Sequence, residues 1–466
     1  MKSAPRLALT LLLLAGSCAR PAPVPSPPAL SFVAPEGGAL EAGAAGVDLT
    51  PLRPVPLAGY GVRFGAAFTA VHDRPVARAL VLRAAGRSVA IVSTDLLVIP
   101  GALRGAVLDR LSDLRLDGLL LAATHTHSGP GGYWDNWFAE LAAMGGFRRA
   151  WASTLADRIA RCVREAAADV RPARLRWACG RAPDLVRNRR FEDGPVDPTV
   201  FQAVLEAATG EPRPIALLLG FGAHPTILGP GNLLLSAEYP GAARGILEEE
   251  TGARVLFLNG ASGDLAPAVP GDGPGFERVR RMGEAVAARA RELSTSLSPP
   301  TREGLAVCER RVTLPPVNTR GAAGPVLRLL FDPLAKTVTP AETVVQAIRV
   351  GDLAIAAFPC DLGSGPGLAL RESFPGPLLL VSYANDYVGY VVDERSFRRG
   401  GYEASMSFYG PGTADLFLRE ARDALDATAR ARTGTGSGSG GRAPRSRSPR
   451  HRSRVRGSPS RGRSKG

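Results

Sequence analysis

Three of the five histidines lie directly after apolar runs that have the length of buried strands. His125 and His127 end the segment LLLAATHTH, and His224 ends the segment IALLLGFGAH. In open α/β sheets, ligand sites gather beyond the carboxyl ends of the strands. The placement of these imidazoles therefore indicates a site at the strand ends.

Two further strand-like runs end in oxygen groups that can bind a metal. The run LAIAAFPCD ends in Asp361, and YANDYVGY supplies Tyr387 and Tyr390. Neutral imidazoles together with a carboxylate suit zinc, with one position left open for water. The five cysteines are too scattered for a four-cysteine zinc site or a disulfide scaffold. The sequence thus predicts a zinc site at strand ends, built from His, carboxylate or Tyr.

The His-x-His spacing predicts different roles for the two histidines. On an extended strand, residues two apart point to the same side, so His125 and His127 would face the same point. One ring can bind metal while the other acts as acid, base or hydrogen-bond donor. The alternative is that each histidine caps a strand end, but three at equivalent positions favour the metal. Asp95, at the end of IVSTD, either orients a histidine or caps its strand.

The pattern from Gly59 to Arg432 is that of one α/β body, with helices layered on a mixed sheet. A hairpin is predicted at 77–82 and 88–96, and further buried strands at 119–123, 215–221, 255–258, 353–358 and 377–382. Apolar periodicity predicts helices at 103–114, 148–168, 241–251, 276–293 and 414–429.

Residues 1–17 resemble a signal peptide of the bacterial lipoprotein type. Lys2 and Arg6 come before an apolar run too short to span a bilayer, and Cys18 is the residue that would be lipidated. Ordinary secretion with cleavage elsewhere is the alternative. Both place the protein outside the cytoplasm, either membrane-anchored or secreted. Residues 18–58 are predicted to form a proline-rich spacer and lead-in.

The net charge of +14 is concentrated at the C-terminus. Residues 433–466 contain nine arginines, one lysine and no acid, so they carry +10 and leave +4 for the rest. This Gly/Ser/Arg composition cannot bury a core, so the tail is predicted to be disordered. We expect it to supplement attachment to anionic membranes. With no aromatic residue for base stacking, it does not indicate a specific nucleic-acid site.

Longer motifs match a known family. The segments GYGVRFG, VHDRPVARALVL, STDLL, THTHSGPGGY, RNRR, AHPT, NGASGDLAP, AAFPCD and DYVGYVVDERSFRRGGYEASMSFYGPGT occur in the order and spacing of the neutral, non-lysosomal ceramidases. The chain therefore resembles that family from Gly59 to about Arg432. The resemblance implies a catalytic domain at 59–432 that hydrolyses the amide bond of a ceramide-like lipid.

The resemblance also implies roles for individual residues. The family's zinc ligands fall on His125, His224, Asp361 and Tyr390. The residues that line the substrate amide fall on His127, Arg189 and Tyr402.

Three features depart from the family pattern. Asp361 replaces the family's Glu, so the metal is expected to sit closer to that strand or to bind through a water. Ala266 stands where well-known members have Ser, which removes a nucleophile there, and nothing in the motif nominates Ser262 as its replacement. Where characterised members continue into an immunoglobulin-like domain, this sequence passes into its basic tail, so a differently shaped substrate entrance is expected.

These observations predict zinc-assisted hydrolysis of an N-acylsphingoid lipid to a fatty acid and a sphingoid base. Zinc lowers the pKa of a bound water to about 7. Arg189 and Tyr402 would donate to the developing oxyanion, and His127 would carry a proton to the leaving amine. The alternatives are a metal-dependent hydrolase of another amide or of an ester, and a lipid-binding lipoprotein without activity. The sequence does not determine the oligomeric state.

Overall fold

The structure is a computed structural model that describes residues 31–33, 38–301, 304–319 and 332–430. In this part of the chain the larger β-sheet has the spatial order β12 (Arg254–Asn259), β10 (Pro214–Phe221), β9 (Thr199–Ala207), β7 (Arg171–Arg181), β2 (Glu41–Asp48), β4 (Val76–Ala84), β5 (Arg87–Thr94) and β6 (Gly118–Ala123). The smaller sheet has the order β1 (Ser31–Val33), β14 (Leu305–Thr313), β15 (Glu342–Val350), β16 (Leu353–Ala357) and β18 (Leu378–Val381). Both sheets contain parallel and antiparallel pairs.

Short strand pairs and helices complete the body. The pairs are β3 (Ala70–Val71) with β11 (Leu234–Leu235), β8 (Val186–Asn188) with β13 (Leu265–Pro267), and β17 (Asp361–Leu362) with β19 (Tyr390–Val391). The longer helices are α2 (Gly101–Arg110), α4 (Arg149–Ala168), α5 (Glu238–Thr251), α6 (Gly275–Ser294), α8 (Ser364–Ser373) and α11 (Thr413–Arg430). The short ones are η1 (Gly61–Arg63), η2 (Ser112–Leu114), α3 (Trp137–Ala139), η3 (Glu140–Met144), η4 (Pro183–Leu185), α9 (Glu394–Arg398) and α10 (Tyr402–Ser405).

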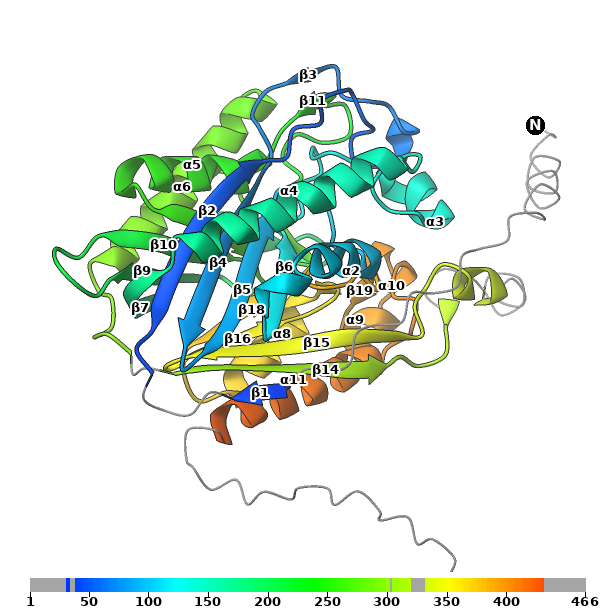
Figure 1. The fold of residues 1–466 in the computed structure, drawn as a ribbon. Coiled ribbons are helices and arrows are strands. Elements are labelled where there is room, and N and C mark those ends of the chain that lie inside the picture. The colour runs from blue at the N-terminus through cyan, green and yellow to red at the C-terminus, as the bar shows by residue number, and fades with distance from the viewer. Residues whose placement is uncertain (1–30, 34–37, 302–303, 320–331, 431–466) are drawn as a thin grey trace, which may run out of the picture.

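The helices cover the outer faces of the sheets (Figure 1). Helices α2 and α4 pack on the β2–β4–β5 part of the larger sheet, α5 and α6 on its other part, and α11 and α8 on the smaller sheet. One apolar core is shared by strands of both sheets and includes Leu80, Leu218, Ile348 and Ile355, all fully buried. Burying each such side chain contributes about 2 kcal/mol. The predicted α/β class, with mixed sheet flanked by helices, is confirmed, although the expected single sheet is two.

Each predicted strand and helix is present, with ends shifted by a few residues. Within the two sheets, the strands that were not predicted are β1, β2, β7, β9, β14 and β15, and the short strands of the three pairs were not predicted either. Strand β2 is rich in Gly and Ala, which have low strand propensity. Its composition serves packing instead, because a Cβ on Gly43 would lie 2.3 Å from the Ala166 carbonyl oxygen of α4. Since β2 pairs with both β4 and β7, the sheet includes residues that the sequence pattern placed in the lead-in before Gly59.

The predicted targeting segment at 1–17, Cys18 and the basic tail at 433–466 lie outside the described residues. Among the helices that are described, none combines the length and the hydrophobicity that crossing a bilayer requires.

Candidate metal centre and substrate site

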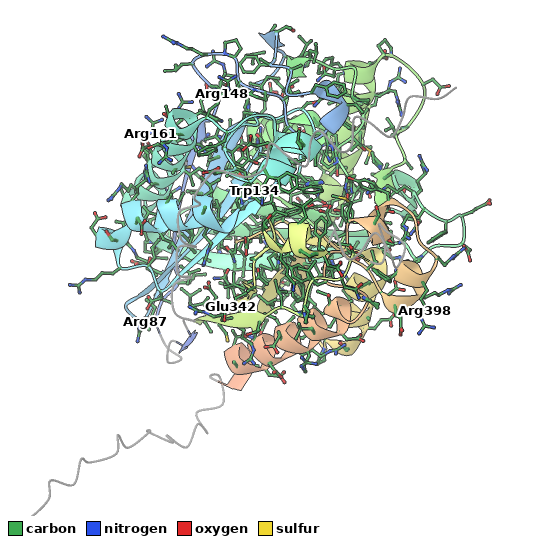
Figure 2. The ribbon with its side chains drawn as sticks, turned by 90° about the vertical axis from the view of Figure 1, so that its right-hand side faces the viewer. Arg87, Trp134, Arg148, Arg161, Glu342 and Arg398 are labelled. Atoms are coloured by element: carbon green, nitrogen blue, oxygen red, sulfur yellow. The ribbon has the colours of Figure 1, made fainter. Side chains whose placement is uncertain are left out.

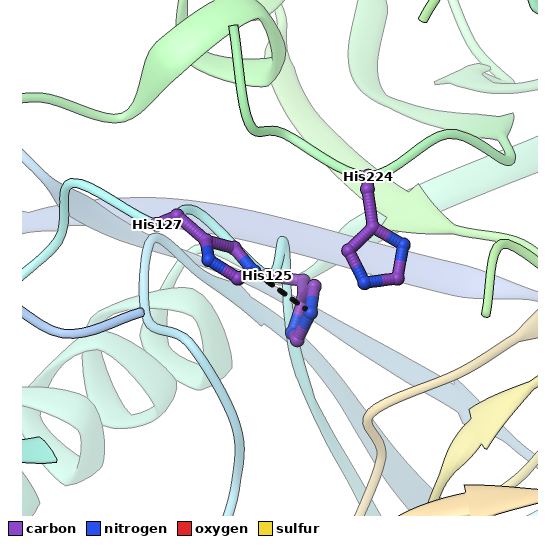
Figure 3. Close-up of side chains that lie close together, drawn as sticks. All are labelled: His125, His127 and His224. Atoms are coloured by element: carbon purple, nitrogen blue, oxygen red, sulfur yellow. Dashed lines mark hydrogen bonds between the residues drawn. The ribbon is translucent and has the colours of Figure 1, made fainter. Parts of the chain in front are cut away.

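Three parallel strand pairs, β5–β6, β10–β12 and β16–β18, end around one point. Asn259, the last residue of β12, donates through Nδ2 to the carbonyl oxygens of Thr124 and Ala223, at 3.1 and 3.4 Å. Ser382, after β18, donates its N–H to the Asn259 carbonyl oxygen at 2.8 Å. These bonds join the segments that follow β6, β10 and β18. The three predicted histidines lie at this junction (Figure 3).

Backbone carbonyls orient the two deepest histidines. His125 Nδ1 lies 2.7 Å from the Leu97 carbonyl oxygen, and His224 Nδ1 lies 2.8 Å from the Ser262 carbonyl oxygen. Because a carbonyl only accepts, Nδ1 carries the proton in both rings and Nε2 is left with a free lone pair. Both side chains are buried, and burial lowers the pKa of His125 to about 3 and that of His224 well below its ordinary value. Both rings are therefore neutral, as metal ligands must be.

Asp361 faces these free lone pairs. Its Oδ1 lies 3.5 Å from His125 Nε2 and 3.4 Å from His224 Nε2. The carboxylate is fully buried, and Oδ1 has no hydrogen-bond partner among the described residues, whereas Oδ2 accepts from the Tyr387 hydroxyl at 2.5 Å. A buried carboxylate oxygen without a donor costs several kcal/mol unless a cation compensates it. The arrangement at Asp361 therefore fits a metal ligand.

Tyr390 completes the predicted ligand set. Strands β17 and β19 pair in parallel with Asp361 opposite Tyr390, and the Tyr390 hydroxyl lies 3.1 Å from His224 Nε2. Ligands about 2.1 Å from a tetrahedral zinc ion lie about 3.4 Å from one another. The separations of 3.1 to 3.5 Å around Asp361 and Tyr390 match that spacing. The structure thus brings together the four residues that were predicted to bind zinc.

His127 lies beside this group and is only half-buried. Its Nε2 is 3.2 Å from His125 Nε2, and the ligand atoms of the three histidines lie within 4.8 Å of one another. Both rings face the same point as predicted, but the expected extended strand is wrong. His125 has a φ of 69°, so the backbone makes a left-handed turn after β6, and this turn brings the His125 and His127 rings together. His127 Nδ1 has no partner in the described part of the chain, and the Tyr60 ring packs 4.9 Å from its ring.

Arg189 connects the group to a second buried cluster. One terminal nitrogen donates to the Tyr390 hydroxyl at 3.1 Å and to the Gly263 carbonyl oxygen at 3.0 Å. Its Nε donates to Glu403 at 2.9 Å, and the other Glu403 oxygen lies 3.0 Å from Arg190 Nε. Glu403 was not among the predicted residues. It is adjacent to the predicted Tyr402, but a lone carboxylate in a motif gives no sign that it bridges two arginines.

Tyr402 marks the outer side of the site. The side chain is 61% exposed, and its ring packs edge-on against the Tyr390 ring with centroids 5.6 Å apart. The predicted substrate-facing residues His127, Arg189 and Tyr402 therefore lie on the side of the metal group that reaches solvent. Their exposure separates them from the buried His125 and His224.

Three other predicted positions have structural roles. The Ser262 carbonyl orients His224, while its hydroxyl lies 2.9 Å from the Tyr383 hydroxyl. Ala266 lies in β13 and pairs with β8 through its backbone. Asp95 accepts from the Arg244 guanidinium and from the Val76 N–H, both at 2.8 Å, and from no histidine among the described residues. Of the two roles predicted for it, Asp95 therefore caps a strand end.

Comparisons with known proteins assign the chain to a family. The family described as "Neutral/alkaline non-lysosomal ceramidase, N-terminal" matches residues 41–309, more than half of the chain.

The chain belongs to this ceramidase family.

Individual relatives support the assignment. The chain is 25% identical to the neutral ceramidase of Pseudomonas aeruginosa, over 74% of this chain and 65% of the relative. It is 29% identical to neutral ceramidase A of Dictyostelium discoideum, over 44% of this chain and 29% of the relative. The crystal structure of the Pseudomonas neutral ceramidase shares the fold, with a TM-score of 0.75, 24% identity and coverage of 85% of this chain and 75% of that one.

The family match and the site overlap only in part. His125, His127, Arg189 and His224 fall inside the matched range, whereas Asp361, Tyr390 and Tyr402 follow it. The chain also spans 65% of the length of the Pseudomonas relative. Activity and substrate are therefore matters for proposal.

Proposed function

We propose that this ceramidase-family chain is a zinc-dependent hydrolase that cleaves the amide bond of N-acylsphingoid lipids. The observation that carries the proposal is the unpaired Asp361 Oδ1, buried within 3.5 Å of two neutral imidazole nitrogens. Two imidazoles, a carboxylate and a phenol form a donor set that suits zinc. The proposed ligands are His125, His224, Asp361 and Tyr390.

The shorter side chain of Asp361 does not keep it from the site. Its Oδ1 reaches both histidine Nε2 atoms, and the Tyr387 hydroxyl bond at 2.5 Å fixes the carboxylate in that orientation. This geometry supports direct binding over binding through a water. The Asp in place of the family's Glu is thus compatible with an intact site.

The proposed chemistry divides between metal and protein. When bound, zinc polarises a carbonyl and lowers the pKa of a water to about 7. His127, whose Nδ1 has no hydrogen-bond partner among the described residues, takes a proton from the attacking water and delivers it to the leaving amine nitrogen. Tyr402 donates its hydroxyl to the amide oxygen as negative charge develops there. Arg189 fixes Tyr390 through their 3.1 Å bond and adds positive charge next to that oxygen.

The relatives, which are named neutral ceramidases, support the proposed substrate class. Ala266 removes the hydroxyl that a covalent mechanism would need there, and the Ser262 hydroxyl is bonded to Tyr383. Both facts favour direct attack by water over an acyl-enzyme.

We further propose that the protein works outside the cytoplasm at a membrane surface. The lipoprotein-type signal at 1–17 would place an acyl anchor on Cys18, and the +10 charge of residues 433–466 would add attraction to anionic lipid. Replacing Cys18 with Ser should release the protein from the membrane fraction, while deleting the tail should only weaken salt-sensitive adsorption.

Fatty-acid release tests the proposed activity. The full-length chain is assayed with a short-chain ceramide, an N-acyl amino acid and an acyl ester of equal chain length, with and without a zinc chelator. His72→Ala serves as a control, since His72 lies outside the site and pairs with Asp73. We expect chelator-sensitive release from the ceramide, unaffected by His72→Ala. Faster hydrolysis of the amino acid amide or the ester would reassign the substrate, and no release from any of them would refute the enzyme.

A further inference from the structure

The described residues expose eight large apolar side chains, and four of them lie on segments that touch. Val62 and Phe64, at η1, are 67% and 93% exposed. Leu141 in η3 is 68% exposed and Trp137 in α3 is 37% exposed. We call these four side chains the apolar rim. Single exposed apolar residues are ordinary, but a group of this kind marks an interaction surface.

The rim is held together by its backbone. The Gly59 N–H donates to the Ala143 carbonyl oxygen at 2.8 Å, and a Cβ on Gly61 would lie 2.8 Å from the Leu141 carbonyl oxygen. Segments η1 and η3 therefore pack directly against each other, with α3 continuous with η3. The exposed side chains of the rim are thus presented by a rigid base rather than by a loose loop.

The rim adjoins the metal and substrate site. Arg63, the last residue of η1, is buried and donates to the His127 and Ala58 carbonyl oxygens, both at 2.7 Å. Tyr60, just before η1, packs against the His127 ring. The segment that exposes Val62 and Phe64 is therefore bonded to the turn that carries the proposed proton carrier.

Exposed arginines flank this face on two sides. Arg148 and Arg149 follow η3 and are exposed. Beyond Tyr402, helix α9 and the residue after it add three exposed arginines that line one surface hollow with Glu394. Arg398 pairs with Glu394, and Arg395 and Arg399 share Asp193, so this group carries one net positive charge. Figure 2, which views the molecule from this side, shows Arg148 in the upper part, Trp134 near the centre and Arg398 at the lower right. Apolar side chains bordered by guanidinium groups complement a bilayer whose phosphates lie above an apolar interior.

We propose that this face docks onto an anionic phospholipid bilayer. Phe64 and Leu141 enter the acyl region, the flanking arginines lie at the level of the phosphates, and the site faces the membrane. The reason for docking rests on the proposed function, because an N-acylsphingoid substrate resides in a bilayer. The docking itself is independent of hydrolysis.

Vesicle binding without substrate tests the proposal. The full-length chain carries Cys18→Ser in every arm, so that no acyl chain contributes, and is sedimented with vesicles of phosphatidylcholine alone or with phosphatidylglycerol. We compare Phe64→Ser/Leu141→Ser with Val71→Ser, which alters an exposed apolar residue in β3, outside the rim. We expect the double variant to lower the partition coefficient on the order of tenfold for both vesicle types. The Val71→Ser control should match the parent.

Unchanged vesicle binding by the double variant would overturn the proposal. If the parent chain then also sediments as a dimer and the double variant as a monomer, this face is an interface between copies of the chain. Release of fatty acid from a soluble short-chain substrate is measured in parallel. If docking is lost and that release persists, the proposed function stands, whereas docking without any release would refute the activity alone.

Discussion

Replacing Glu403 with Gln removes the negative charge that two buried arginines share. Arg190 is 4% and Glu403 5% exposed, whereas Arg189 is 22% exposed. Removing one partner of a buried ion pair costs about 3–5 kcal/mol. Solvent at Arg189 and the oxygen that Gln retains reduce that cost, so we expect a loss of about 2–3 kcal/mol in the free energy of unfolding.

The same change should act on the site through Arg189. Without the Glu403 charge, the guanidinium is held less firmly through its Nε, which loosens its 3.1 Å bond to the Tyr390 hydroxyl. We expect kcat on a short-chain ceramide to fall on the order of tenfold, equivalent to about 1.4 kcal/mol, with little change in KM. Denaturant unfolding and steady-state kinetics on the same preparations measure both effects.

A matched control separates charge from position. Glu394→Gln removes an acid in neighbouring α9 whose partner Arg398 is 76% exposed, so both stability and kcat should stay close to those of the parent. If Glu403→Gln is as stable and as active as Glu394→Gln, the reasoning about the Arg189 cluster is refuted. A loss of stability with unchanged kcat would leave Glu403 a purely structural residue.

Three further predictions follow from the site and its surroundings. His127→Ala and Tyr402→Phe should each lower turnover about a hundredfold with zinc content unchanged, and loss of metal in both would mean that they belong to the ligand set. Ser262→Ala should leave most of the turnover, since its hydroxyl is hydrogen-bonded to Tyr383; an inactive, folded, zinc-loaded variant would require covalent catalysis instead. Burial raises the pKa of Glu238 from 4.5 to about 8, so the unfolded chain loses this proton first and stability should fall as pH rises from about 4.5 to 8. By pH 7 the loss in the free energy of unfolding is on the order of 3 kcal/mol. Glu238→Gln should therefore be more stable than the parent at pH 8 but not at pH 4.5. If the unfolding free energies of variant and parent changed with pH in the same way across this range, the assignment would be contradicted.

The sequence predicted the site better than it predicted the sheets. The apolar runs that end in His125, His224 and Asp361 can be recognised in the sequence, because the length of a strand and the polar residue at its end are features of consecutive residues. Strand β2 could not be recognised in this way. Gly43 lies there because α4 packs too closely to leave room for a side chain, and that contact exists only in the folded chain. The division into two sheets likewise depends on pairings between distant segments.

The contacts that sequence reasoning missed act through other residues. Glu403 positions Arg189. Tyr387, which the sequence offered only as a possible metal-binding oxygen group, orients the carboxylate of Asp361. The backbone bonds that fix the histidine tautomers come from the carbonyls of Leu97 and Ser262, whose side-chain types are irrelevant to that role. Such contacts become visible only when the chain is folded.

Zinc content of the purified full-length chain, measured by elemental analysis after dialysis, tests the central claim most directly. The parent and the His72→Ala control should each retain one zinc per chain, whereas His125→Ala and His224→Ala should retain almost none, because each loses a neutral imidazole that faces Asp361. Stoichiometric zinc in both site variants, or none in the parent, would contradict the account.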